Sequence, residues 1–307
     1  MTSKAFVIAD VFTDRQFGGN QLAVYTDGTG LDTETMQNIA REMNYSETTF
    51  LLPPEKGGDY RVRIFTPAHE LPFAGHPLVG SGFVIVAEKM KQLVEPSTLV
   101  KLETGVGEIR VEVASEAGRP GHTRMTQPLP EVRRTFEDLP RLAAALGIEA
   151  RSIQGTGLPV EAIYNGLNVM VVPVDSLAAV QALQFEGSAI KQISNEVGAQ
   201  TVLVFTRETV EPGSTVHCRV GAPAAGVLED AATGSANGPL GFYLVRHRLV
   251  GIKPTTLILS EQGYEMKRPS KLHIELDVDV SAGNRATAVR VGGSVVVSGR
   301  GEMLIQE

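Results

Sequence analysis

The sequence predicts an α+β protein of two similar halves, each burying a central helix against a curved mixed sheet. A local pattern occurs twice, as Glu70-Leu-Pro-Phe-Ala-Gly75-His76 ahead of Gly82-Phe83 and as Glu229-Asp230-Ala-Ala-Thr-Gly234-Ser235 ahead of Gly241-Phe242. The matched residues are all 159 positions apart (229−70, 234−75, 241−82 and 242−83), which is the signature of an internal repeat. The order of strand-like and helix-like segments also repeats, so both halves are expected to share one architecture.

The first half alternates strand patterns with helix patterns. Alternating or apolar runs predict strands over residues 5–11, 22–25, 48–52 and 60–65, and a hairpin over 99–103 and 108–113. Asp32 is expected to cap a helix that runs to Met43. Pro77 is expected to open a second helix that continues to Ala87.

The second half repeats this order. Strands are predicted over residues 162–164, 168–172 and 201–205, and a helix over 188–197. The turn-rich segment 115–121 is the predicted boundary between the halves. The predicted domains are therefore 1–118, completed by a returning C-terminal strand over 296–307, and 119–295. The segment 292–305 is expected to form two short strands around a Gly-rich turn.

Composition excludes several classes of function. The chain has 307 residues, 42% of them hydrophobic, and its longest apolar run is too short for a transmembrane helix, so a soluble, cytoplasmic protein without a membrane partner is expected. The net charge of −7 argues against nucleic acid as a partner. Cys218 is the single cysteine and the histidines lack metal-binding spacing, so no disulfide, metal site or cofactor is expected.

The repeated glycines indicate where a ligand binds. Gly75 and Gly234 each stand at the start of a predicted helix, where backbone N–H groups are free and the helix dipole is positive. Such helix ends favour a small anionic substrate. The equivalent positions after the glycines hold His76 and Ser235, which are both polar.

Glu47 is the first candidate for proton transfer. It lies where a predicted helix passes into an apolar strand, and partial burial there would raise the pKa of its carboxyl group enough for acid–base chemistry. The alternative is an exposed Glu at the end of a strand. Gln200 occupies the matching position of the second half, so the repeat supplies one carboxylate and not a pair.

His76 and Asp230 are further candidates. The helix dipole is expected to lower the pKa of His76 and favour the neutral imidazole, although a capping or surface histidine is the alternative. Asp230 lies four residues before Gly234, within reach of a substrate amine or hydroxyl group, or it stabilises a turn.

Three motifs in fixed order carry a resemblance to a known family. Ser46-Glu47-Thr48, Phe73-Ala-Gly75-His76-Pro77 and Glu229-Asp230-Ala-Ala-Thr-Gly234-Ser235-Ala236 resemble the PhzF-type phenazine-biosynthesis isomerase family, which has the diaminopimelate epimerase fold. Ala231 departs from the proline common in that family's third motif.

The resemblance implies two similar domains with an active site in the cleft between them, a homodimer, and no cofactor. It implies that Glu47 is the single proton shuttle, that His76 and Asp230 orient substrate and assist transfer, and that Gly75, Gly234 and Ser235 hold a carboxylate. Ala74 and Thr233 stand where the epimerase branch has catalytic cysteines, so two-thiol racemisation is excluded.

The predicted function is an isomerase that moves a proton within a small carboxylated substrate, as in the isomerisation of trans-2,3-dihydro-3-hydroxyanthranilate. Two alternatives stay open at this point. One is an epimerase or racemase of another amino-acid derivative that uses Glu47 with His76. The other is a catalytically silent metabolite-binding protein of the same fold.

Overall fold

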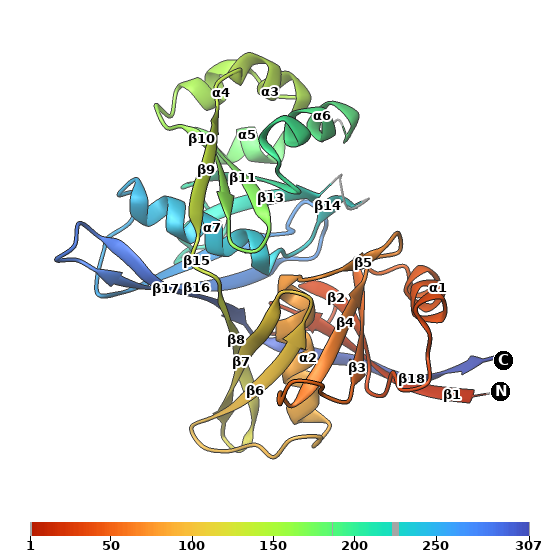
Figure 1. The fold of residues 1–307 in the computed structure, drawn as a ribbon. Coiled ribbons are helices and arrows are strands. Elements are labelled where there is room, and N and C mark those ends of the chain that lie inside the picture. Colours follow the sequence, from red (N-terminus) through yellow and green to blue (C-terminus); the bar gives the residue numbers. More distant parts are fainter. Residues whose placement is uncertain (1, 186, 223–226, 307) are drawn as a thin grey trace. The chain divides into compact units, whose positions relative to one another are not determined.

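The computed structural model describes residues 2–185, 187–222 and 227–306, shown as a ribbon in Figure 1. The chain divides into two compact units. The first unit contains the residues up to Thr126 together with those from Gly292 onward, and the second contains Gln127–Val291.

The first unit consists of a sheet, a central helix and one outer helix. Its helices are α1 (Thr33–Met43) and α2 (Gly75–Ala87). Its strands are β1 (Thr2–Val11), β2 (Asn20–Tyr25), β3 (Glu47–Leu52), β4 (Tyr60–Phe65), β5 (Glu70–Leu71), β6 (Ser97–Thr104), β7 (Gly107–Glu116), β8 (Arg119–Gln127) and β18 (Val295–Ile305).

The second unit has the same two helices and three additional short ones. Its helices are α3 (Leu139–Ala145), α4 (Ala150–Gln154), α5 (Leu177–Gln181), α6 (Gly187–Val197) and α7 (Gly234–Arg246). Its strands are β9 (Glu131–Phe136), β10 (Val160–Tyr164), β11 (Asn168–Pro173), β12 (Thr201–Thr206), β13 (Val216–Ala222), β14 (Val227–Asp230), β15 (Thr255–Gln262), β16 (Ser270–Asp279) and β17 (Arg285–Gly293).

Strand pairing shows that the two units share one topology. In the first unit the order is β18-β1-β2-β3-β4-β6-β7, with the β2–β3 and β4–β6 pairs parallel and the others antiparallel. In the second unit the order is β9-β10-β11-β12-β13-β15-β16, with β11–β12 and β13–β15 parallel and the others antiparallel. The predicted duplication is therefore confirmed at the level of sheet topology.

The central helices α2 and α7 are each 13 residues long and nearly enclosed. Every residue of α2 from Gly75 to Val86 is buried, and the helix packs against β1, β2, β3, β6, β7 and β18. A helix that is apolar on all sides has to be surrounded by protein. The curved sheet of the unit provides that surrounding surface.

The repeated glycines Gly82 and Gly241 allow each central helix to approach its sheet closely. A Cβ atom on Gly82 would lie 2.5 Å from Cγ1 of Val111 on β7. A Cβ atom on Gly241 would lie 2.6 Å from Cγ2 of Ile274 on β16. The same packing requirement therefore explains why this glycine occurs in both copies of the repeat.

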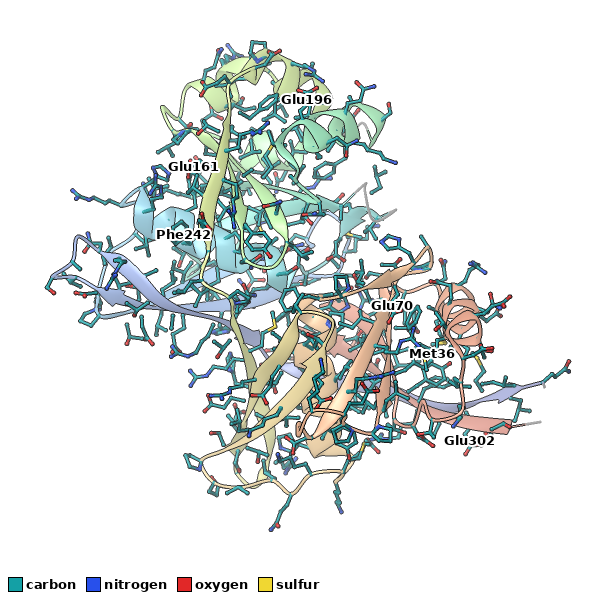
Figure 2. The ribbon with its side chains drawn as sticks, viewed as in Figure 1. Met36, Glu70, Glu161, Glu196, Phe242 and Glu302 are labelled. Atoms are coloured by element: carbon teal, nitrogen blue, oxygen red, sulfur yellow. The ribbon has the colours of Figure 1, made fainter. Side chains whose placement is uncertain are left out.

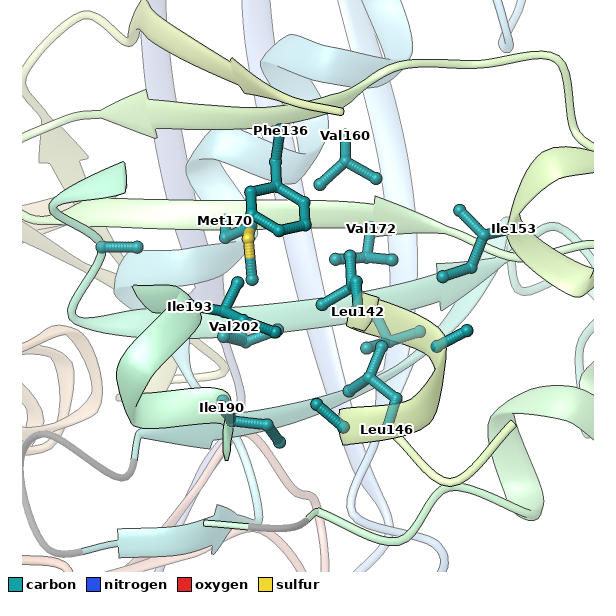
Figure 3. Close-up of a cluster of buried hydrophobic side chains, with 14 of the residues drawn as sticks. Phe136, Leu142, Leu146, Ile153, Val160, Met170, Val172, Ile190, Ile193 and Val202 are labelled. Atoms are coloured by element: carbon teal, nitrogen blue, oxygen red, sulfur yellow. The ribbon is translucent and has the colours of Figure 1, made fainter. Parts of the chain in front are cut away.

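The outer helices cover separate apolar clusters. In the first unit, Met36 and Ile39 of α1 pack with Tyr25, Phe50 and Phe65. In the second unit, α3 and α6 contribute to a cluster that includes Leu142, Ile190, Ile193 and Met170 (Figure 3). These clusters fix each outer helix against the strands that flank it.

The structure differs from several sequence expectations. Helix α2 begins at Gly75 and not at Pro77, so His76 lies within its first turn. The segment 292–305 forms the end of β17 and the long strand β18, because the glycines at 299 and 301 lie inside the ladder that β18 makes with β1. Residues 115–121 belong to the β7–β8 hairpin. Within the described residues, no helix is long and apolar enough to cross a membrane.

Candidate active site

Glu47 is the first residue of β3 and lies at a sharp change of chain direction. Helix α1 ends at Asn44, whose φ of 52° is left-handed, a conformation that asparagine tolerates better than most residues. Strand β3 then pairs in parallel with β2, which places Glu47 opposite Leu22. The Glu47 side chain is 13% exposed, so it is largely shielded from water and is not the exposed strand-end residue of the alternative interpretation.

His76 lies beside Glu47. Its Nε2 atom is 3.4 Å from Oε2 of Glu47, and the imidazole is only 3% exposed. The two residues come from different elements, the start of β3 and the first turn of α2. The structure thus brings together the two candidates that the sequence placed 29 residues apart (76−47).

Asn20 and Ser46 extend this pair into a chain of polar contacts. The Nδ2 atom of Asn20 lies 3.1 Å from Nδ1 of His76. The hydroxyl of Ser46 donates to Oδ1 of Asn20 at 2.8 Å. Ser46, Asn20, His76 and Glu47 therefore follow one another within hydrogen-bonding or close polar contact.

Burial controls the protonation of His76. Desolvation, opposed by a hydrogen bond with the backbone of Gln21, lowers the pKa of His76 to about 3. The imidazole is consequently neutral near pH 7. The predicted direction is confirmed, although desolvation and not the helix dipole is the main cause.

Gly75 begins α2 without a side-chain cap. The N-cap residue Ala74 makes no capping hydrogen bond, and its extended backbone leads directly into the helix. A helix end without such a cap presents backbone N–H groups and a positive dipole end to a ligand.

The second unit brings together the other predicted residues. Asp230 ends β14 and is 9% exposed, and its Oδ2 atom accepts a hydrogen bond from Oγ1 of Thr233 at 2.7 Å. Gly234 and Ser235 follow as the first two residues of α7 and are also buried. The N-cap Thr233 uses its hydroxyl on Asp230 and makes no side-chain cap to the helix.

Gln262 forms hydrogen bonds that hold the loop containing Asp230. Its fully buried amide donates to the carbonyl of Asp230 at 2.8 Å and to Oγ1 of Thr233 at 3.0 Å. Its Oε1 atom accepts from the backbone N–H of Thr233 at 3.0 Å. Ser270 adds a hydrogen bond to the carbonyl of Ala231. Both ends of the Gln262 amide are satisfied, which fixes the loop conformation.

The first turn of α7 is held by two further amides. Pro239 lacks an N–H group, so it removes the helical hydrogen bond to the carbonyl of Ser235. Nδ2 of Asn165 donates to that carbonyl at 2.8 Å, and Nε2 of Gln127 donates to the carbonyl of Gly234 at 2.8 Å. Gly238 leaves room for Gln127, because a Cβ atom there would lie 1.9 Å from its Oε1.

The opposite end of α7 is anchored by a buried carboxylate. Glu161 of β10, labelled in Figure 2, is 4% exposed and lies 3.0 Å from Nε2 of His247. Arg246 approaches the other oxygen of Glu161 at 3.6 Å. With contacts at both ends, α7 is held in a fixed position for presenting Gly234 and Ser235.

Burial lowers the reactivity of Cys218. Cys218 is fully buried, and burial raises the pKa of its thiol to about 12. Among the residues that the structure describes, no group of three His, Cys, Asp or Glu residues is arranged to hold a metal ion.

Comparison with known proteins identifies the family. A family described as "phenazine biosynthesis-like protein" (PhzC-PhzF) matches residues 9–301. The chain belongs to this family. The match includes all three of the motifs on which the resemblance was stated, so the predicted recognition is confirmed.

Several relatives match over nearly their whole length. Trans-2,3-dihydro-3-hydroxyanthranilate isomerase from Pseudomonas aeruginosa is 37% identical over 299 residues, which cover 94% of this chain and 95% of that protein. The enzyme of the same name from Pseudomonas fluorescens is 36% identical, with 98% and 99% covered. These relatives confirm the predicted enzyme class, an isomerase.

Solved structures confirm the predicted fold. The PhzF-family protein from Bacillus anthracis superposes with a TM-score of 0.86 at 25% identity, covering 99% of this chain and all of that one. A probable proline racemase from Agrobacterium radiobacter superposes with a TM-score of 0.70 at 14% identity, covering 99% and 93%, and shows similarity of fold alone.

The sequence identified the candidate reactive groups and missed the residues that orient them. Asn20, Gln127, Asn165 and Gln262 were not singled out, although each forms hydrogen bonds to a predicted site residue or its helix. Asn20 follows the Gly18-Gly19 pair, which is a local turn signal. The partners of the three others are far apart in sequence and give no local signal.

Proposed function

We propose that this protein is a cofactor-independent isomerase in which Glu47 moves a proton within a small carboxylated substrate. The observation that carries the proposal is the close contact between the shielded Glu47 carboxylate and a buried His76 that is neutral near pH 7. Because burial lowers the pKa of His76 to about 3, its imidazole is a weak base, which leaves the carboxylate as the group that accepts a proton in this pair.

Glu47 would act first as a base and then as an acid. It removes a proton from a carbon whose conjugate base is delocalised and returns the same proton to another carbon. General acid–base catalysis of this kind contributes about 10²–10⁴-fold. His76 supports the transfer as a hydrogen-bonding group beside the carboxylate.

Asp230, Gly75, Gly234 and Ser235 complete the proposed residue set. The absence of a side-chain cap on α2 and on α7 supports an anion-binding role for their first N–H groups. Asp230, fixed by Thr233 and by Gln262 at its own carbonyl, would orient a polar group of the substrate.

The named relatives supply the first compound to assay. Because two relatives at 36–37% identity are named as isomerases of trans-2,3-dihydro-3-hydroxyanthranilate, we propose this compound or a similar small cyclic carboxylate as substrate. We also propose a homodimer, to be measured by light scattering after size-exclusion chromatography. A monomer at micromolar concentration would contradict that assembly.

The experiment is isomerisation of this compound in D₂O by the purified protein, followed by NMR. We expect double-bond migration, and we expect Glu47→Gln to bind the compound while losing at least 10²-fold in kcat. Glu42→Gln, which changes an exposed carboxylate on α1, is the matched control and should retain activity.

Two other results would redirect the assignment. Deuterium at a stereocentre without double-bond migration would identify an epimerase or racemase. Absence of turnover in the wild type across a panel of small carboxylates, with binding retained, would identify a metabolite-binding protein.

A further inference from the structure

We propose that Asn20 is a positioning residue that fixes the tautomer of His76, with the ring proton on Nε2 facing Glu47. This inference deepens the proposed function and rests on it for the role of Glu47. It assigns a task to a residue that contributes no acid or base of its own.

The direction of the Ser46 hydrogen bond orients the Asn20 amide. Ser46 Oγ donates to Oδ1 of Asn20 at 2.8 Å, so the acceptor end of the amide faces Ser46. The NH₂ end of the amide then faces Nδ1 of His76 at 3.1 Å. A neutral imidazole that accepts at Nδ1 carries its proton on Nε2.

The other face of the ring agrees with this tautomer. Nε2 of His76 points toward Oε2 of Glu47 at 3.4 Å. A proton on Nε2 faces the carboxylate across a close polar contact that is not a hydrogen bond, and its partial positive charge favours the ionised carboxylate. A proton on Nδ1 would instead place the Nε2 lone pair against the carboxylate oxygen, which is repulsive unless Glu47 is protonated.

Burial keeps the contact between Asn20 and His76 in place. Asn20 is 2% exposed and His76 is 3% exposed, so water does not exchange freely with either partner. The turn that delivers Asn20 is also constrained, because Gly19 has a φ of 60° and a Cβ atom there would lie 2.3 Å from the carbonyl oxygen of Val11. Asn20 then starts β2 directly opposite Val11 on β1.

The backbone of Gln21 is the competing partner of the ring. Its hydrogen bond with His76 opposes the desolvation effect on the pKa, so it favours a proton on the ring. If that proton were on Nδ1, the Asn20 amide would have to turn its oxygen toward the ring, and the Ser46 hydroxyl would then have to accept from the amide NH₂ instead of donating to Oδ1. The ring nitrogen of His76 that carries the proton therefore distinguishes the two orientations of the Asn20 amide.

The test is ¹⁵N NMR of the full chain labelled in its histidine rings, at neutral pH and without substrate. His76→Gln identifies the signals of His76 by their loss. In the wild type we expect a protonated Nε2 and an unprotonated Nδ1. In Asn20→Asp the carboxylate becomes an acceptor for Nδ1–H, so we expect a protonated Nδ1 and a fall of at least tenfold in kcat with a smaller change in KM.

Asn165→Asp is the matched control. Asn165 is a fully buried amide of the second unit that donates to the carbonyl of Ser235 in α7. This variant introduces a buried carboxylate of the same size, so it should lower stability while leaving the His76 signals unchanged. It separates a loss of folding from a change of tautomer.

Ser46→Ala keeps the proposal testable if Asn20→Asp does not fold. Removing the Ser46 hydroxyl removes the hydrogen bond to Oδ1 of Asn20, so part of the His76 population should move its proton to Nδ1. The proposal is overturned by a wild type protonated at Nδ1, or by a folded Asn20→Asp that retains the wild-type tautomer. Because the NMR signals need no substrate, failure to turn over trans-2,3-dihydro-3-hydroxyanthranilate would count against the proposed function alone.

Discussion

Nε2 of His76 lies 3.4 Å from Oε2 of Glu47, and this contact joins the first turn of a central helix to the start of a strand. The His76 imidazole is shielded from water, whereas the Glu47 carboxylate keeps limited contact with water. Such an arrangement keeps the histidine neutral while leaving the carboxylate able to reach a ligand. The roles proposed for the two residues rest on this difference in burial.

His76 should remain neutral throughout the range in which the enzyme folds. Since desolvation lowers its pKa to about 3, its ring signals should not titrate between pH 5 and pH 8 in an NMR experiment. A midpoint above pH 5 for His76 would contradict the burial argument.

Alanine at either repeated glycine should destabilise its unit. Gly82→Ala and Gly241→Ala each force a methyl group against a buried β-branched side chain, and overpacking of this kind costs about 1–3 kcal/mol. Urea unfolding monitored by circular dichroism measures the free energy of unfolding. The matched control is Gly251→Ala, where an added Cβ atom meets nothing within 4 Å. Equal effects at Gly82 and Gly251 would remove the packing explanation of the repeat.

Asn165 and Pro239 should be energetically coupled. Asn165→Ala leaves the buried carbonyl of Ser235 unsatisfied and should cost about 1–3 kcal/mol of stability. In a Pro239→Ala background the helix regains an N–H group for that carbonyl, so the cost of Asn165→Ala should be smaller. A double-mutant cycle in urea measures the coupling. Strictly additive effects would show that Asn165 does not replace the missing helical hydrogen bond.

The pH dependence of stability should depend on a buried His217. Its ring lies 3.0 Å from Glu261 and 3.1 Å from Glu265. Desolvation alone would lower the pKa of His217, but the two carboxylates outweigh it and raise the pKa above 6.5. For Glu261, desolvation is outweighed by hydrogen bonds from His217 and from backbone N–H groups, which bring its pKa to about 2.

The signs of these shifts define the expected profile. The raised pKa of His217 adds stability that is complete below pH 6.5 and is lost as pH rises through the higher folded value. The lowered pKa of Glu261 adds stability that is complete above pH 4.5 and is lost as pH falls toward 2. His217→Gln should therefore cost most between about pH 4.5 and 6.5, on the order of 3–5 kcal/mol for breaking a buried pair.

Thermal or urea unfolding at several pH values measures this profile. His69→Gln, at an exposed histidine, is the control and should give the wild-type pH dependence. The free energy of unfolding of the wild type and of His217→Gln would be compared from pH 5 to pH 9. Parallel curves would show that the His217 network does not contribute to the pH dependence.

Local sequence signals were sufficient for the elements that begin with a clear cap or a strict alternation. Asp32 caps α1 as expected, and its carboxylate accepts from the backbone N–H of Thr35. Strand β4 has the predicted bounds, Tyr60–Phe65. The helices α3, α4 and α5 were missed, because they are 5–7 residues long and have too few turns to show a period.

The sequence by itself determined the duplication, the family and the candidate residues for proton transfer. A repeat at constant spacing and three motifs in fixed order are properties of the chain as written, so no coordinates were needed to find Glu47, His76 and Asp230. Tertiary structure alone decided that His76 is buried and neutral, that Asn20 and Ser46 lie next to it in a chain of polar contacts, and that Gln262 and Asn165 hold the loop and helix of the second unit. The reason is physical: desolvation and hydrogen-bond direction depend on which distant segments surround a side chain, and those segments meet only when the sheets close around their central helices.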